Sequence, residues 1–328
     1  MNHGHIRTAL VVGAGLSGLA TAIALRKLGV VVDLAELDPG WRADNTAVRV
    51  DGAALQLFEM LDIAASFRDQ SCWRDGADRS AVVPRPVLAR LLADTALAMG
   101  AEVRLGTTIR TWRQDADGVD VDYSDSRRAR YDMLVAADGV LSRMRDTILR
   151  SAPRPAYSGE AIISAHLPQP ASMQAAAEWR QQGVAIELHP VSADALYLSV
   201  RTTLPGGATA VDALSVLKDI LARSDIAAVQ ALAGRLDEAA HASLCPLYRL
   251  ALRPPWHKGR ALLVGDAARG NIARHGPVSR GGLQDAVVLT QALASAGSLE
   301  TALDAYADQR WNAGLTHTGA APPETALA

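Results

Sequence analysis

Short apolar runs along the chain predict the strands of a parallel sheet. Residues 6–12, 131–137 and 260–264 are largely apolar, and each run leads directly into a glycine or a pair of glycine and aspartate. Apolar runs of this length are typical of strands that are covered on both faces. Another strand closes at Glu36, after the helix that follows the first run. The pattern therefore predicts an α/β domain.

Apolar positions at helical spacing predict the helices that cover this sheet. Residues 84–99 place a row of leucines and alanines on one face, and Gly100 ends the segment. The same spacing predicts further helices at residues 53–61, 211–222, 283–294 and 299–311. Between these elements we expect a loop at residues 38–49, a hairpin or loop at 71–81 and a short strand at 101–105.

A second kind of sheet is expected in the middle of the chain. Residues 162–253 alternate between apolar and polar side chains, which is typical of antiparallel strands with one solvated face. A prolyl pair at 254–255 precedes the return to apolar strand character. We therefore expect an antiparallel sheet domain inserted between two halves of the α/β domain. Asp117-Gly118 separately predicts a tight hairpin within the first half.

The first apolar run continues into Gly13-x-Gly15-x-x-Gly18, which predicts a dinucleotide-binding turn. Gly13 lets the chain turn sharply, Gly15 lets backbone approach a pyrophosphate, and Gly18 lets the next helix pack close to the strand. The N-terminus of that helix offers free N–H groups to phosphates. Glu36 follows at the spacing at which a carboxylate takes both hydroxyls of a ribose.

Composition excludes several other classes of protein. Of the 328 residues 49% are hydrophobic, and the net charge of −2 comes without a basic stripe, which argues against nucleic-acid binding. Two cysteines without CxxC spacing fit the reducing cytoplasm, and the histidines lack metal-ligand spacing. An uncharged stretch between Arg7 and Arg26 approaches the length of a membrane span, but its central glycines argue against a span or a signal peptide.

Three motifs together resemble the FAD-dependent aromatic hydroxylases, the p-hydroxybenzoate hydroxylase-like flavin monooxygenases. The glycine turn is followed by Ala137-Asp138-Gly139-x-x-Ser142-x-x-Arg145 and then by Gly265-Asp266-Ala267-Ala268, with Arg85-x-x-Leu88 between the first two. Order and spacing match over about residues 6–315. The resemblance implies FAD as cofactor, NAD(P)H as reductant, and hydroxylation of a small, aromatic substrate with O2.

The resemblance also implies a fold and its division. It implies a Rossmann-like FAD-binding domain with an inserted antiparallel β-sheet substrate domain. The FAD-binding domain is expected to comprise residues 1–70, 84–155 and 254–315. The substrate domain is expected to comprise residues 71–83 and 156–253, and residues 316–328 to form a flexible tail.

Roles for individual residues follow from the resemblance. The ADP half of FAD is expected at the glycine turn and Glu36, and the ribityl chain at Asp266. Asp138 and Gly139 are expected near the pyrophosphate, in a motif linked to nicotinamide nucleotide use. A helix that starts near Pro277 is expected to point its N-terminus at the flavin ring. The full set of expected cofactor-binding residues is Gly13, Gly15, Gly18, Glu36, Arg42, Arg85, Asp138, Gly139, Asp266, Pro277 and Val278.

Several positions depart from the family pattern, and they lie where the flavin ring is expected. Arg269 stands where the family has histidine, Ala273 where it has proline and Val278 where it has glycine. Asn45-Thr46-Ala47 replaces a glycine-rich loop. A β-branched residue is costly where φ must be positive. The departures leave open a flavin-dependent reductase or dehydrogenase, or a non-catalytic FAD-binding protein.

Other choices also stay open at the level of sequence. Asp138 and Asp266 could instead serve ordinary turns and helix caps, because Asp and Gly are favoured there. No catalytic acid or base is expected, because the cofactor carries the chemistry. The choice between NADH and NADPH, the substrate and the oligomeric state are not determined. Side chains on the strand-like segments that could cover the ring are His166, His189, Tyr197, Arg201 and Tyr248.

Overall fold

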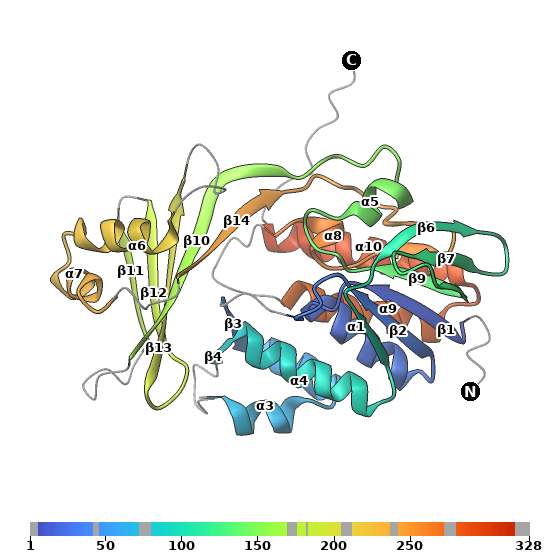
Figure 1. Cartoon of the computed structure of the whole chain (residues 1–328), viewed down its shortest axis with the longest axis horizontal. Helices are drawn as coiled ribbons and strands as arrows, with labels where there is room; N and C mark the ends of the chain where they lie inside the picture. The colour runs from blue at the N-terminus through green and yellow to red at the C-terminus, as the bar shows by residue number, and fades with distance from the viewer. Residues whose placement is uncertain are drawn as a thin grey trace, which may run out of the picture.

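Two larger sheets of different kinds organise the molecule (Figure 1). The computed structural model describes residues 6–41, 46–71, 80–168, 176–181, 183–204, 212–236, 242–271 and 280–318. One sheet has six strands in the order β15-β16-β9-β1-β2-β5, and the other has five in the order β11-β12-β13-β10-β14. The expected fold class, an α/β unit with an inserted antiparallel sheet, is therefore confirmed.

The parallel sheet brings the carboxyl ends of its central strands to one edge. Its strands are β1 (Thr8–Val12), β2 (Val31–Glu36), β5 (Glu102–Leu105), β9 (Met133–Ala136) and β16 (Ala261–Leu263), with β15 (His257–Lys258) antiparallel beside β16. Val12 lies opposite both Ala35 and Ala136, and Ala136 lies opposite Leu263. Residues that follow these four strands must therefore meet at the same edge.

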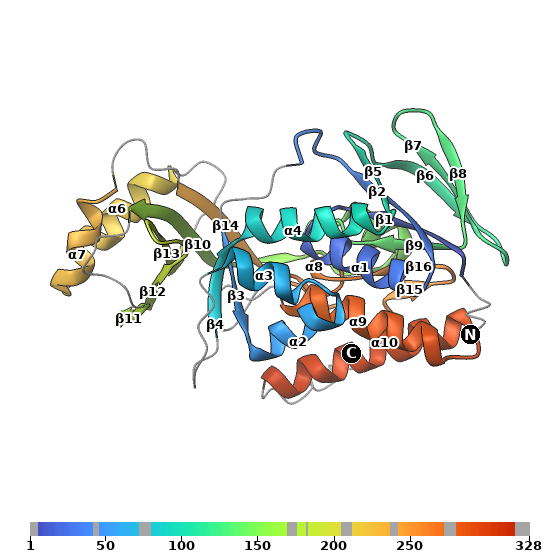
Figure 2. The ribbon, with the colours of Figure 1, turned by 90° about the horizontal axis from the view of Figure 1, so that it is seen from below.

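The longer helices pack against one another as one layer beside the parallel sheet. α1 (Leu16–Lys27) buries nearly all of its N-terminal two-thirds and packs against α4 (Arg85–Ala98) and α9 (Arg280–Ser295). α10 (Leu299–Thr318) packs along α9, as Figure 2 shows from below. The expected helices at 84–99, 283–294 and 299–311 are confirmed, with the last two extended at their ends. Of the helices within the described ranges, none is long and apolar enough to cross a membrane.

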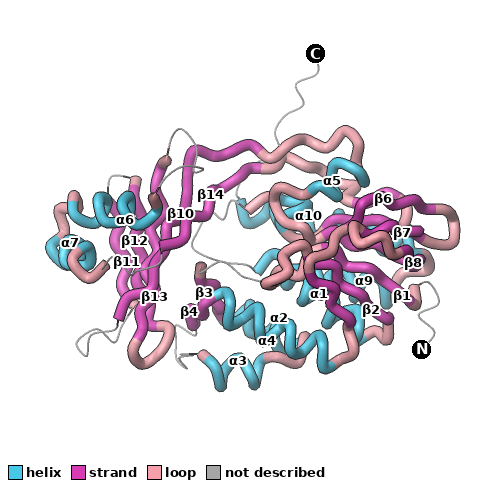
Figure 3. Tube along the Cα trace, viewed as in Figure 1, coloured by secondary structure: helices cyan, strands magenta, loops and turns pink. Residues whose placement is uncertain are grey.

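The antiparallel sheet has its own core on one face. Its strands are β10 (Ala156–Pro168), β11 (Ala177–Gln181), β12 (Val184–Pro190), β13 (Ala195–Thr203) and β14 (Ala242–Arg249). Alternate residues such as Ile163, Leu198 and Val200 pack against leucines of α6 (Ala213–Ala222) and α7 (Ala227–Ala233). These two helices lie on the outer face of the sheet, away from the parallel sheet (Figures 1 and 3).

Some local expectations are wrong, and tertiary contacts explain them. The expected loop at 38–49 ends in strand β3 (Ala47–Asp51), which pairs with β4 (Ser80–Pro84) and leads into α2 (Gly52–Met60). Ala47 and Val82 are buried against Tyr197 of the antiparallel sheet, a contact that no local pattern reveals. Two short helices, α3 (Ala64–Gln70) and α7, were also not expected. The domain boundaries stay a prediction, and β3 and β4 pair across one of them.

The expected single strand at 131–137 is divided in the structure. β8 (Arg128–Tyr131) pairs with β7 (Val119–Tyr123), and only β9 enters the parallel sheet. β7 also pairs with β6 (Ile109–Gln114), which confirms the hairpin at 117–118. Side-chain hydrogen bonds attach β8 to the parallel sheet, because Tyr131 donates to Asp33 of β2 at 2.5 Å and its hydroxyl lies 2.8 Å from that of Tyr123.

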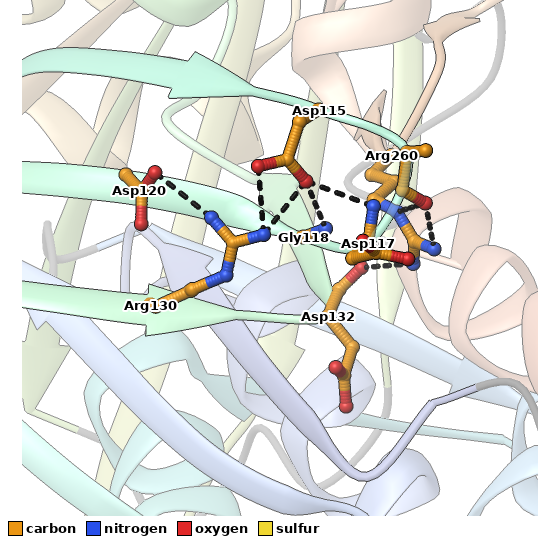
Figure 4. Close-up of polar contacts among 8 residues, drawn as sticks. Asp115, Asp117, Gly118, Asp120, Arg130, Asp132 and Arg260 are labelled. Carbon is orange, nitrogen blue, oxygen red and sulfur yellow. Dashed lines mark hydrogen bonds and ion pairs between the residues drawn. The ribbon is translucent and has the colours of Figure 1, made fainter.

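A polar network fixes the β6–β7 turn to the rest of the molecule (Figure 4). Asp115 accepts hydrogen bonds from the backbone N–H groups of residues 117 and 118. Its two carboxylate oxygens also both accept from Nη2 of Arg130, at 2.6 and 2.8 Å. Arg130 also donates to Asp120 at 2.8 Å. Arg260, just before β16, donates to the carbonyl oxygens of Ala116 and Asp132. The turn is therefore held at the edge of the sheet opposite the strand ends.

A pH dependence follows from the pair formed by Asp115 and Arg130. Hydrogen bonds from Arg130 and from the turn lower the pKa of Asp115 to about 2. Because this value lies below the unfolded value of about 3.9, the ionised pair stabilises the fold above about pH 4 and loses that effect as the pH falls towards 2. We expect Asp115→Asn to reduce the free energy of unfolding slightly at neutral pH, since the pair is exposed.

The measurement is urea unfolding of both proteins from neutral pH down to the lowest pH at which they fold. The difference between the wild type and Asp115→Asn should shrink as the pH falls below about 4. Glu300→Gln on α10 controls for the loss of one surface carboxylate elsewhere. A difference that stays constant over this pH range would contradict the assignment.

Candidate cofactor site

Two glycines of the first motif are required by the packing of the protein itself. Gly13 follows β1 with φ +97°, and a Cβ there would lie 2.5 Å from the carbonyl oxygen of Ala137. A Cβ on Gly18 would overlap the carbonyl oxygen of Gly13. Backbone atoms at the N-terminus of α1 are thus in direct contact with backbone atoms that follow β1 and β9.

Gly15 is different, because neither its backbone angles nor its contacts with the described residues require a glycine. Its φ of −74° suits any residue, and an added Cβ would meet no atom of the described residues within 4 Å. It is the N-cap of α1 and, having no side chain, does not cap that helix end itself. The free N–H groups and the partial positive charge of the helix N-terminus face this open space. A group that lies directly on the backbone, such as a pyrophosphate, fits the absence of a side chain.

Glu36 lies beside the glycine turn at the end of β2. Its two carboxylate oxygens accept hydrogen bonds from the backbone N–H groups of Ala14 and Asp38, each at 2.8 Å. Each oxygen keeps a further lone pair, so the carboxylate remains able to accept from hydroxyl groups. Trp41 donates from its indole N–H to the carbonyl oxygen of Ala14 at 3.1 Å, which holds the segment after β2 against the turn. Sequence analysis missed Trp41, and no motif pointed to it.

Asp138 acts within the protein as a cap. One oxygen accepts from the Ser142 hydroxyl at 2.5 Å and the other from the backbone N–H of Met144 at 3.0 Å. Ser142 in turn caps α5 (Arg143–Ile148) by accepting from the backbone N–H of Arg145. These bonds favour the alternative role of Asp138 as an ordinary turn and cap residue. Gly139, beside it, has φ +83° and open space at the position of a Cβ.

Arg145, the last residue of the motif that begins at Ala137, has a structural role. Its guanidinium is 2% exposed and donates to the carbonyl oxygens of Val140 and Ala267, each at 3.0 Å. Desolvation lowers its pKa, but the ordinary value is so high that it stays charged. Arg145 thus ties the turn after β9 to the turn after β16, two segments far apart in the sequence.

Asp266 lies at the carboxyl edge after β16, at the start of α8 (Asp266–Arg269). Its side chain is exposed to solvent, although the protein around it desolvates the carboxylate and raises its pKa. The positive charges of Arg85 and Arg269 oppose that shift. Arg85 and Asp266, two expected cofactor residues from opposite halves of the chain, are therefore close enough for their charges to interact. Solvent access leaves the Asp266 carboxylate available to a ligand.

A buried carboxylate on α9 holds the turn that carries Asp266. Asp285 is fully buried and accepts from the backbone N–H of Gly265 at 2.6 Å, from Arg269 at 2.7 Å and from Arg310 of α10 at 2.7 Å. Arg269, which departs from the family pattern, therefore has a structural partner. Sequence analysis missed Arg310 altogether, and a long-range ion pair leaves no local signal.

Some of the expected residues lie outside the described part of the chain. These are Arg42, Asn45, Ala273, Pro277 and Val278. Of the altered loop at 45–47, Thr46 accepts a hydrogen bond from the backbone N–H of Arg85 at 2.7 Å, and Ala47 is buried in β3. Of the side chains that could cover the ring, His166 and Tyr197 are in ring contact on the antiparallel sheet, with centroids 5.6 Å apart.

The parallel sheet, the glycine turn and the strand-end carboxylate together define a dinucleotide-binding fold. Residues 73–316 match the family described as FAD binding domain. The chain belongs to this family, and with it to the FAD-dependent aromatic hydroxylases that its motifs resemble.

Relatives with related names cover most of the chain. It is 26% identical over 344 residues to the FAD-dependent urate hydroxylase of Klebsiella pneumoniae subsp. pneumoniae, which covers 92% of this chain and 85% of the relative. It is also 26% identical over 332 residues to the aurachin C monooxygenase/isomerase of Stigmatella aurantiaca, with 91% and 84% covered.

Solved structures share the fold over nearly the whole chain. Klebsiella pneumoniae HpxO complexed with FAD and uric acid matches with a TM-score of 0.80 at 25% identity, covering 94% of this chain and 85% of that one. CtdE in complex with FAD and a substrate matches with a TM-score of 0.82 at 13% identity, covering 95% and 88%. The second match shows the fold alone.

The contrast between Gly15 and Gly18 gives a direct test of the glycine turn. We expect Gly15→Ala to fold with nearly unchanged stability and to bind FAD at least about ten-fold more weakly, because the methyl group enters the space of the ligand. We expect Gly18→Ala to lose about 3 kcal/mol of unfolding free energy, because its Cβ meets backbone. Urea unfolding of the FAD-free proteins and FAD titration give both values. Unchanged FAD affinity in Gly15→Ala would rule out its expected role.

The buried Asp285 gives a second prediction. We expect Asp285→Asn to lower the free energy of unfolding by about 3 kcal/mol, because two arginines lose their buried counter-charge. Asp304→Asn is the matched control, since Asp304 is 57% exposed and pairs with His257 at 2.9 Å. Chemical denaturation should show a small change for the control. Equal losses in both variants would show that burial of Asp285 is not what matters.

Proposed function

We propose that this protein is an NAD(P)H- and O2-dependent FAD monooxygenase that hydroxylates a small aromatic substrate. The observation that carries the proposal is the space at Gly15 that the described residues leave open. It lies at the N-terminus of α1, whose N-cap residue has no side chain, beside a carboxylate that keeps acceptor capacity. When bound, FAD would take electrons from the nicotinamide nucleotide and use O2 to deliver one oxygen atom to the substrate. Relatives named as FAD-dependent hydroxylases and monooxygenases support this chemistry.

The residues of this chain would bind and orient the cofactor. The α1 N-terminus and Gly15 would hold the pyrophosphate, and Glu36 would accept from the ribose hydroxyls of the adenosine half. Asp266 would accept from the ribityl hydroxyls, with its turn fixed by Asp285. Gly13 and Gly18 would act by packing, and Asp138 by capping the turn that precedes α5. Gly139 would give the pyrophosphate close access to the backbone.

The two sheets would have different roles. We propose that the part built on the parallel sheet binds FAD and that the antiparallel sheet of β10–β14 contacts the substrate. The strand β4 would join the two, since Val82 is buried against Tyr197 while the next element begins with Arg85, whose charge reaches Asp266. The cysteine content supports a reducing compartment, and we propose the cytoplasm.

Flavin spectroscopy tests the proposal directly. Purified protein mixed with FAD should acquire a bound-flavin spectrum, and NADH or NADPH should bleach it under anaerobic conditions. In air, a substrate found by its stimulation of oxygen uptake should acquire one atom from labelled O2. Asp266→Asn should bind FAD about ten-fold more weakly, because a neutral amide is the weaker acceptor.

Two results would contradict the proposal in different ways. Protein that binds no FAD would overturn the cofactor assignment. Stoichiometric FAD that neither NADH nor NADPH reduces, with or without aromatic compounds, would instead favour a non-catalytic FAD-binding protein. Product without labelled oxygen would favour a reductase or dehydrogenase.

A further inference from the structure

The turn that begins at Asp266 adds to the outer edge of the antiparallel sheet. In the described part of the chain β14 is the last strand of that sheet and pairs with one strand, β10. Its other edge receives Gly270 and Asn271, the two residues that follow α8, and Gly270 forms an antiparallel bridge with Arg249. β14 runs from the antiparallel sheet towards the side of the molecule built on the parallel sheet (Figure 1). The turn thus acts as a short additional strand.

Asn271 makes most of this contact through its side chain. Its Oδ1 accepts from the backbone N–H of Tyr248 at 2.7 Å, and its Nδ2 donates to the carbonyl oxygen of Pro246 at 3.1 Å. Its own backbone N–H donates to the carbonyl oxygen of Tyr248 at 3.3 Å. One amide side chain therefore satisfies both a donor and an acceptor of the strand edge, as a paired strand would.

The same turn is attached to Asp266 at its other end. Gly270 donates its backbone N–H to the carbonyl oxygen of Asp266 at 2.9 Å, which closes α8 after a single helical turn. Gly270 has φ +76°, and a Cβ there would lie 2.9 Å from the carbonyl oxygen of Tyr248. Glycine is therefore required for this approach to β14. One hydrogen-bonded turn separates Asp266 from the edge of the antiparallel sheet.

The pairing of β14 with β10 is irregular at the same place. The register shifts between Tyr157 and Ala161 of β10. These two residues lie opposite Tyr248 and Pro246, the residues that Asn271 contacts. A bulge interrupts the ladder of backbone hydrogen bonds. The turn after α8 thus supplies backbone partners to β14 where β10 pairs with it least regularly.

A similar amide link lies elsewhere in the molecule, away from the expected cofactor residues. Gln114 of β6 accepts from the backbone N–H of Arg260 at 2.7 Å and donates to the carbonyl oxygen of Lys258 at 3.0 Å. It joins two distant segments by the same two kinds of hydrogen bond. Asn271 differs because the segment that it joins to β14 begins at Asp266.

We propose that Asn271 is a positioning residue that couples Asp266 to β14, so that occupation of the cofactor site orders the edge of the antiparallel sheet. The contacts run without a break from Asp266 through Gly270 and Asn271 to Tyr248. The coupling is reciprocal, so a ligand that orders β14 strengthens FAD binding by the same factor. The inference rests on the proposed function, because it takes Asp266 as a contact of FAD.

Amide hydrogen exchange of the full chain with and without FAD tests the coupling. We expect saturating FAD to slow exchange in residues 242–249 about ten-fold in the wild type, because ligand at Asp266 suppresses local opening of the turn. In Asn271→Ala the same FAD should slow this segment about two-fold or less. Each protein is compared with its own FAD-free form, so the hydrogen bonds lost with the side chain cancel.

FAD titration of a double variant gives a second readout. We expect Asp266→Asn to weaken FAD binding about ten-fold and Asn271→Ala about five-fold. The double variant should lose about ten-fold, well short of the product of the two losses, because Asn271 acts through Asp266. A side chain that merely stabilises the fold would not give this dependence.

Gln114→Ala is the matched control. It removes an amide side chain with the same two kinds of backbone hydrogen bond, so it and Asn271→Ala should lower the urea midpoint by similar amounts. Gln114→Ala should nevertheless keep the wild-type FAD affinity and the wild-type effect of FAD on residues 242–249. If Asn271→Ala does not fold, Asn271→Asp, which keeps the acceptor for the Tyr248 N–H, should show a smaller FAD effect than the wild type.

Three outcomes would overturn the inference. They are exchange in residues 242–249 that FAD leaves unchanged in the wild type, an equal FAD effect in the wild type and the Asn271 variant, and losses of FAD affinity that multiply in the double variant. All three presuppose bound FAD. Failure to bind FAD would instead count against the proposed function, so the two failures are distinguishable.

Discussion

The close approach of backbone at the N-terminus of α1 is the constraint on which the rest of the site depends. Gly18 touches the carbonyl oxygen of Gly13, and both Gly265 and Gly282 leave room for the Ser17 side chain. A single methyl group at any of these contacts would separate the helix from the strand ends. Gly13 follows β1, Gly18 lies in α1, Gly265 follows β16 and Gly282 lies in α9, so these contacts fix three segments that are distant in the sequence. It leaves the first N–H groups of α1 directed at the open space beside Gly15.

Buried charged groups also hold the carboxyl edge of the sheet together. The buried Asp285 joins the Gly265 backbone, Arg269 and Arg310, so the turn after β16 is attached to both C-terminal helices. Arg145 joins that turn to the turn after β9. Such pairs contribute little net stability compared with apolar packing, but losing one partner is costly. Their effect is to hold the carboxyl edge of the sheet in a single arrangement.

The arginine at position 269 shows how the meaning of a departure depends on its surroundings. As a sequence difference from the family, it helped to leave open a non-catalytic FAD-binding protein. In the structure its guanidinium reaches the buried Asp285 and lies against Gly281, so it fills a structural role. Asp138 matches the family pattern and was expected at the cofactor. In the structure, however, both of its carboxylate oxygens accept hydrogen bonds from within the protein.

The sequence by itself determined the parallel strands, the helices at 84–99, 283–294 and 299–311, the glycine turn and the strand-end positions of Glu36 and Asp266. These depend on local periodicity and on backbone geometry, which neighbouring residues specify. Only the tertiary structure decided that β3 pairs with β4, that Asp285 meets two arginines, and that Arg145 joins the turn after β9 to the turn after β16. Pairing, burial and hydrogen-bond satisfaction depend on atoms contributed by distant segments, so no local pattern can carry them.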